Sequence, residues 1–183
     1  MYSLFLSPFQ LKGLGKVYLF TGTGPGKTTS ALGLALRAVG QGKKVVIVQF
    51  LKWWKNTGEY KIRERLSPHY EIHQFGRKGW MKKEELGEED RELVRKGLEF
   101  AERIAKEKKP DLLILDELNL AAGWKLVGVE EILKLLDNLP KKTDVVLTGR
   151  YAPKGLRERA DVVVEVREIK IPEPFQAKRG IQY

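Results

Sequence analysis

The residues best suited to chemistry form one glycine-rich stretch, Thr21–Thr29, which reads Thr-Gly-Thr-Gly-Pro-Gly-Lys-Thr-Thr. Glycines let the backbone turn so that successive N–H groups point inward and form a nest for an anion. Lys27 adds a full positive charge, and the Thr28 hydroxyl can bind a divalent cation. A helix expected to begin here would add the partial positive charge of its N-terminus. We therefore predict a nucleotide phosphate-binding loop (P-loop) made by Gly22, Thr23, Gly24, Gly26, Lys27, Thr28 and Thr29.

Two acidic residues, Asp116 and Glu117, directly follow the apolar run Leu112–Leu115. A carboxylate at the end of a strand beside a P-loop is the expected second anchor for Mg²⁺. Acidic residues also end many strands without any function, so the pair gains its meaning from the neighbouring loop. On this reasoning the predicted metal ligands are Thr28, Asp116 and Glu117.

Larger side chains near the same strand ends suggest further ligand contacts. Arg150 lies in Thr-Gly-Arg after another apolar run, where it can bind phosphate oxygens through two parallel N–H groups or simply lie in a surface turn. Tryptophans usually pack in cores. Trp53, Trp54 and Trp80 are instead flanked by Lys, Gly and Arg, which favours exposed loops facing a large, flat ligand.

The elements that position these residues follow from short apolar runs that alternate with helical patterns. Strands are expected at 16–21, 44–50, 70–75, 111–116, 143–148 and 161–166, and helices at 28–39, 88–108 and 129–138. Such alternation implies an α/β fold, a mostly parallel sheet with helices on both faces, and the glycine-rich loop makes it a P-loop NTPase fold of the RecA-like kind. Ligands bind such sheets beyond the carboxyl ends of the strands. We expect one nucleotide-binding domain over residues 1–183, with residues 1–14 as an N-terminal arm.

Composition narrows the function classes. The chain has 183 residues, no cysteine and a net charge of +10. Eight basic residues precede the first acidic residue, Glu59, so the first third suits an anionic partner such as a nucleotide or a nucleic acid, or is simply a solubilising surface. No run is long enough to cross a membrane, and Met1–Leu11 lacks the basic residues and cleavage site of a signal peptide. Together with the absence of cysteine, this leads us to expect a cytoplasmic protein.

From Lys16 to Tyr183 the chain resembles the P-loop type of ATP-dependent corrinoid adenosyltransferases. That family shares a P-loop that lacks its first glycine, the position of Thr21 here. The other residues that carry the resemblance are Ala31–Ala38, Val48–Phe50, Lys52, Thr57–Glu59, Asp116–Asn119, Thr148–Pro153 and Lys178–Tyr183. Arg179 replaces the usual lysine of the closing motif, and the tryptophans around Trp53 and Trp80 depart from the family pattern.

The resemblance implies transfer of the 5′-deoxyadenosyl group of ATP to the Co(I) of cob(I)alamin or a corrinoid precursor, with release of triphosphate. It implies catalytic roles for Lys27, Thr28 and Glu117, and an aromatic residue near Trp80 against the lower face of the corrin. It further implies a homodimer, Mg²⁺, and an external electron donor such as a flavoprotein, since the chain has no thiol of its own.

Two other functions remain open from the residues alone. A RecA-like ATPase would use Glu117 to polarise water for attack on the γ-phosphate. A nucleic-acid-binding module would stack bases on the indoles of Lys-Trp-Trp-Lys at 52–55, although this is the less favoured alternative.

Overall fold

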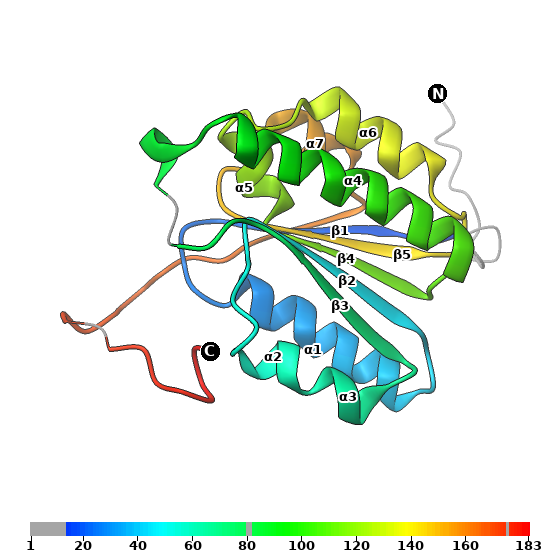
Figure 1. The fold of residues 1–183 in the computed structure, drawn as a ribbon, viewed down its shortest axis with the longest axis horizontal. Helices are drawn as coiled ribbons and strands as arrows, with labels where there is room; N and C mark the ends of the chain where they lie inside the picture. The colour runs from blue at the N-terminus through cyan, green and yellow to red at the C-terminus, as the bar shows by residue number, and fades with distance from the viewer. Residues whose placement is uncertain (1–13, 80–81, 175) are drawn as a thin grey trace, which may run out of the picture.

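The computed structural model describes residues 14–79, 82–174 and 176–183, and this part of the chain is built on one six-stranded sheet (Figure 1). The strands are β1 (Val17–Thr21), β2 (Val45–Phe50), β3 (Tyr70–Phe75), β4 (Leu112–Asp116), β5 (Asp144–Thr148) and β6 (Val162–Glu165). Their order is β3-β2-β4-β5-β1-β6, and every neighbouring pair is parallel. The predicted α/β class is confirmed, and all six strands end at the same edge.

Helices cover both faces of this sheet, as Figure 1 shows. On one face lie α1 (Lys27–Gly40), α2 (Gly58–Lys61) and α3 (Arg63–Leu66), and on the other α4 (Glu88–Lys108), α5 (Leu118–Gly123), α6 (Val129–Asn138) and α7 (Lys154–Arg159). A 3₁₀ turn, η1 (Lys83–Glu85), precedes α4. The three long helices match the sequence prediction, and none of the described helices is long and apolar enough to span a membrane.

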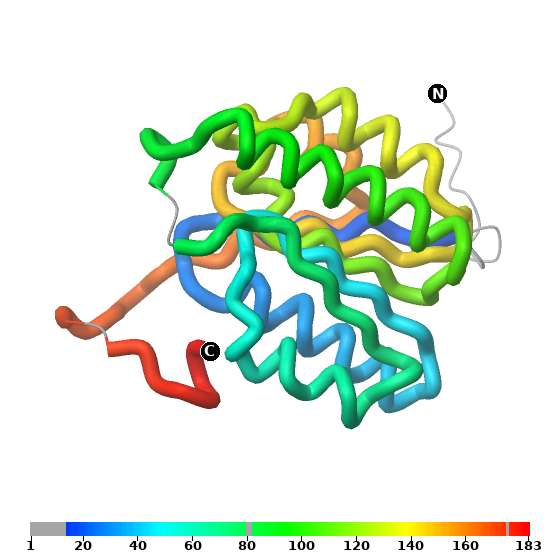
Figure 2. Tube along the Cα trace, in the orientation of Figure 1, coloured from blue at the N-terminus to red at the C-terminus, as the bar shows by residue number. Residues whose placement is uncertain are grey.

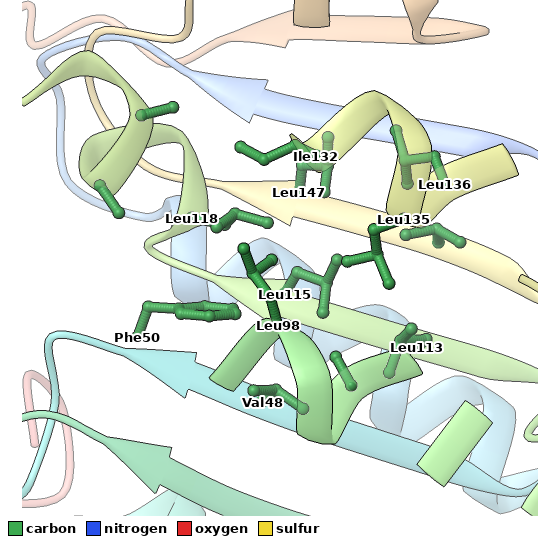
Figure 3. Packing of buried hydrophobic residues seen from close by; sticks show 14 of the residues in the cluster. Val48, Phe50, Leu98, Leu113, Leu115, Leu118, Ile132, Leu135, Leu136 and Leu147 are labelled. Atoms are coloured by element: carbon green, nitrogen blue, oxygen red, sulfur yellow. The ribbon is translucent and has the colours of Figure 1, made fainter. Parts of the chain in front are cut away.

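The larger apolar core lies between the sheet and α4, α5 and α6 (Figure 3). Phe50 at the end of β2 is fully buried there, beside Leu115 of β4 and Leu118 of α5. Burying one such side chain contributes about 1.5–3 kcal/mol to folding. The ends of the central strands, where the predicted site residues lie, are therefore fixed by packing on this face.

The second core lies under α1, the helix that follows the glycine-rich loop. Ala31 and Ala35 are the fully buried residues of its inner face, and they pack against β2, β4 and β5. Because alanine adds only a methyl group, the helix axis can lie close to the sheet. This close packing fixes the first turn of α1 at the edge where the strands end.

The chain beyond β6 forms a long strap. Figure 2 shows it leaving the sheet edge and turning back, so that its last residues lie near the segment that follows β2. The rings of Trp54 and Tyr183 meet there, with centroids 5.2 Å apart. The strap thus brings the C-terminus to the ligand edge of the sheet.

Candidate functional site

The glycine-rich loop joins β1 to α1 at the carboxyl edge of the sheet. Gly22 and Gly26 have positive φ values of 100° and 109°, a region that L side chains rarely adopt. A Cβ at Gly22 would also collide with the backbone of Val166, to which the amide of Gly24 donates a hydrogen bond. Only glycines allow this turn to pack against the strap and still lead directly into the helix.

The first turn of α1 offers free backbone donors, because no side chain in the described part of the chain caps its N-terminus at Gly26. Lys27 is 6% exposed and folds back over the loop, where its Nζ donates to the Gly24 carbonyl at 2.6 Å. Burial lowers the pKa of Lys27, and Arg150 adds to this effect, while Glu117 opposes it. The loop is thus a nest of N–H groups with one buried cation inside it.

Asp116, the last residue of β4, accepts four hydrogen bonds. Its Oδ1 accepts from Thr28 Oγ1 at 2.8 Å and from Thr148 Oγ1 at 2.6 Å. Its Oδ2 accepts from Gln49 Nε2 at 3.0 Å and from Lys52 Nζ at 2.6 Å. Burial acts to raise the pKa of Asp116, but Lys52 and the two hydroxyl donors outweigh it and hold the pKa below its usual range. This carboxylate stays charged and joins four elements.

The carboxylate of Glu117 has a different environment from that of its neighbour Asp116. Its backbone is left-handed at φ 65°, and its N–H donates to Thr148 Oγ1 at 3.0 Å. Its Oε2 is buried and has no partner among the described residues. Burial and, next, the charge of Asp116 raise the pKa of Glu117, against the opposing effect of Lys52. A buried, unpartnered carboxylate oxygen at a strand end is suited to binding a cation.

One cavity of about 1120 Å³ connects these groups. The glycine-rich loop, Lys52, Glu117 and Arg150 form its polar part. Its apolar wall includes Leu32, Leu36, Ile62, Leu66, Leu120 and Trp124. The last four residues of the strap, 180–183, also line it. A polar end for phosphates and a wide apolar wall suit a ligand that carries both kinds of group.

The structure brings most of the predicted site residues together. The loop Gly24–Thr29, Glu117 and Arg150 face the cavity, and Asp116 lies directly behind Thr28. Gly22 and Thr23 belong to the same loop but do not line the cavity. Trp80, predicted to contact the ligand, lies outside the described residues, so its role stays a prediction.

The other tryptophans take different positions. Trp124 lines the cavity. Trp54 lies beside Tyr183, and Trp53 donates from its ring nitrogen to the Gly79 carbonyl at 3.0 Å. Both are partly buried, so the predicted exposed loop is in fact half-covered.

Sequence reasoning assigned no role to Gln49, Lys52, Thr148 or Tyr183. Three of them hold Asp116, and the fourth lines the cavity. One signal was present for Gln49: a polar residue inside a buried strand must find a partner. Lys52 could not be placed from the sequence, because its contact depends on a turn at Leu51, whose φ is 58°.

Comparisons with known proteins agree on one family. Residues 13–183 match the family model described as ATP:corrinoid adenosyltransferase BtuR/CobO/CobP. The chain is 36% identical over 171 residues to the corrinoid adenosyltransferase of Escherichia coli (strain K12), covering 92% of this chain and 86% of that protein. It is 33% identical, with the same coverage, to corrinoid adenosyltransferase CobA of Salmonella typhimurium (strain LT2). A corrinoid adenosyltransferase of Sinorhizobium sp is 32% identical, covering 92% of this chain and 80% of that protein.

Proposed function

The chain belongs to the ATP:corrinoid adenosyltransferase family, enzymes that transfer an adenosyl group from ATP to a corrinoid, and we propose the specific course of that reaction here. The 5′-deoxyadenosyl group moves from ATP to Co(I) of cob(I)alamin or a corrinoid precursor, and inorganic triphosphate leaves. One observation carries this proposal: a single cavity joins a cationic phosphate nest to a broad apolar wall. A nucleoside triphosphate and a large ring substrate can meet there.

The protein's part in the displacement is electrostatic and positional. A bond forms between cobalt and C5′, the C5′–O bond breaks, and its electron pair stays with the triphosphate oxygen. The backbone N–H groups of 26–29, together with Lys27 and Arg150, stabilise the charge of the leaving triphosphate. The apolar wall excludes water that would compete for C5′. No general base is required, because Co(I) itself supplies the electron pair.

Mg²⁺ fits the oxygen donors of this site, and when bound it neutralises charge on the triphosphate. Thr28 Oγ1 keeps acceptor capacity after donating its proton to Asp116, and Glu117 Oε2 has no partner within the described part of the chain. Asp116 is already occupied by four donors. We therefore assign direct metal binding to Thr28 and Glu117, with Asp116 orienting Thr28. Mg²⁺ characteristically takes one or two protein oxygens and completes its shell with phosphates and water.

The remaining parts of the proposal concern partners. A chain without cysteine has no thiol to reduce the corrinoid, so an external donor, such as a flavoprotein, supplies the electron. A homodimer and a cytoplasmic location complete the proposal by analogy with the family. The lower face of the corrin is assigned to the aromatic residue at Trp80.

Identification of the products tests the proposed function against ATP hydrolysis. The enzyme is incubated with ATP, Mg²⁺ and a chemically reduced corrinoid, and the nucleotide and phosphate products are separated. We expect adenosylcorrinoid and triphosphate in equal amounts, and no ATP consumption when the corrinoid is left out. ADP and phosphate formed without corrinoid would instead identify an ATPase in which Glu117 activates water.

A further inference from the structure

Lys52 contacts two elements of the phosphate site, the first turn of α1 and the end of β4. It lies two residues beyond the end of β2, after the turn at Leu51, and its side chain is 29% exposed. Its Nζ lies 2.6 Å from Asp116 Oδ2 on β4 and 3.3 Å from Thr28 Oγ1 on α1. It therefore contacts both the carboxylate and the hydroxyl that flank the proposed metal position.

The hydrogen bonds of Thr28 define what Lys52 does there. A hydroxyl has one proton to donate, and Thr28 gives it to Asp116 Oδ1 at 2.8 Å. The two lone pairs of Thr28 Oγ1 remain, and in this structure Lys52 Nζ donates to this oxygen at 3.3 Å. A metal ion also binds a hydroxyl through its acceptor side. The ammonium group and a divalent cation therefore both approach Thr28 Oγ1 on the side of its lone pairs, away from its proton.

The charges around Thr28 also favour competition between Lys52 and a divalent cation. Asp116 and Glu117 place two neighbouring carboxylates at the buried end of β4, and Lys52 forms an ion pair with the first of them. A divalent ion at Thr28 would lie within a few ångströms of this ammonium and be repelled by it. ATP changes the balance, because its triphosphate offers the flexible lysine side chain another anion.

We propose that Lys52 is an internal cation that takes the place of the divalent metal in the nucleotide-free enzyme. It holds Thr28 and Asp116 in their binding geometry, and it makes metal binding depend on nucleotide. Lys52 is on this view a positioning residue that prevents metal from entering before ATP. The inference rests on the proposed metal role of Thr28 and Glu117.

Mn²⁺ binding followed by EPR, with and without ATP, tests this inference on the full chain. The neutral variants are Lys52→Gln, which keeps a donor for Asp116, and Lys52→Met, which keeps the volume. Lys52→Arg keeps the charge. Lys43→Gln is the matched control, because Lys43 pairs with Asp111 at 3.0 Å but does not line the cavity.

Without nucleotide, the neutral variants are expected to bind Mn²⁺ at least ~10-fold more tightly than the wild type, since a repelling unit charge is gone. Lys52→Arg and Lys43→Gln are expected to bind as the wild type does. Equal nucleotide-free affinity in the wild type and in whichever neutral variants fold would overturn the inference while leaving the proposed function intact. Failure of the wild type to bind Mn²⁺ even with ATP would overturn the proposed metal site, and this inference with it.

Discussion

Replacing Asp116 with asparagine tests whether this residue organises the site. The asparagine side chain would keep one acceptor oxygen for the hydroxyls of Thr28 and Thr148. Its NH₂ group would face the two donors that now bind Oδ2, from Gln49 at 3.0 Å and Lys52 at 2.6 Å. Three donor groups would then meet with no acceptor between them.

Neither donor can adjust without loss. Gln49 can reverse its amide only by giving up the bond that its Oε1 accepts from Gln74 at 2.9 Å. Lys52 has no acceptor to offer and would remain partly buried without its carboxylate. Breaking one side of a buried ion pair costs about 3–5 kcal/mol, and because Lys52 is 29% exposed we expect about 3 kcal/mol here.

The assay is urea unfolding of the nucleotide-free protein. A loss of about 3 kcal/mol should also lower Tm by roughly 6–12 °C for a chain of this size. Asp111→Asn is the control, because it breaks an exposed pair with Lys43 and should cost no more than about 1 kcal/mol. An Asp116→Asn protein within about 1 kcal/mol of the wild type, with an unchanged m-value, would refute the assigned role of Asp116.

Three further predictions concern the loop, a turn and pH. Lys27→Ala should slow adenosyl transfer ~10²–10³-fold in steady-state kinetics while corrinoid binding persists, and unchanged ATP kinetics would contradict its role. Gly149→Ala should destabilise the fold by ~1–3 kcal/mol in urea, because φ is 131° and the added Cβ would lie 2.6 Å from the Leu120 nitrogen; wild-type stability would contradict this. The pKa of Asp111 is lowered, chiefly by the Lys44 backbone N–H, so its contribution to stability is present above about pH 4 and is lost as the pH falls through the folded-state pKa. Asp111→Asn should therefore lose stability at about pH 7 but not at about pH 2, as unfolding free energies at both pH values would show.

Much of the fold could be predicted because its signals are local. The run at 70–75 coincides with β3, and the helix expected at 28–39 is α1 within a residue at each end. Helices α2, α3, α5 and α7 have only four to six residues, too few for an apolar period to be read. The strand order could not be predicted either, because it depends on how each segment that connects two strands crosses the sheet.

The candidate site also has features that could be predicted from the sequence and features that could not. Gly22 and Gly26 could be predicted because a nest requires positive φ, and both have it. The different environments of Asp116 and Glu117 could not be predicted. They depend on a left-handed turn at Glu117 and on donors brought from β2 and β5.

The strand order explains why these donors meet. β5 lies between β1, which leads into the glycine-rich loop, and β4, which ends at Asp116. Two strand spacings of about 4.8 Å therefore separate the end of β1 from the end of β4, and Thr28 in the first turn of α1 closes this distance by donating to Asp116 at 2.8 Å. Thr148, at the end of β5, contacts both acidic residues by donating to Asp116 and accepting from the Glu117 N–H. The intervening strand thus orients the acidic residues from one side, while the first turn of α1 meets Asp116 through Thr28.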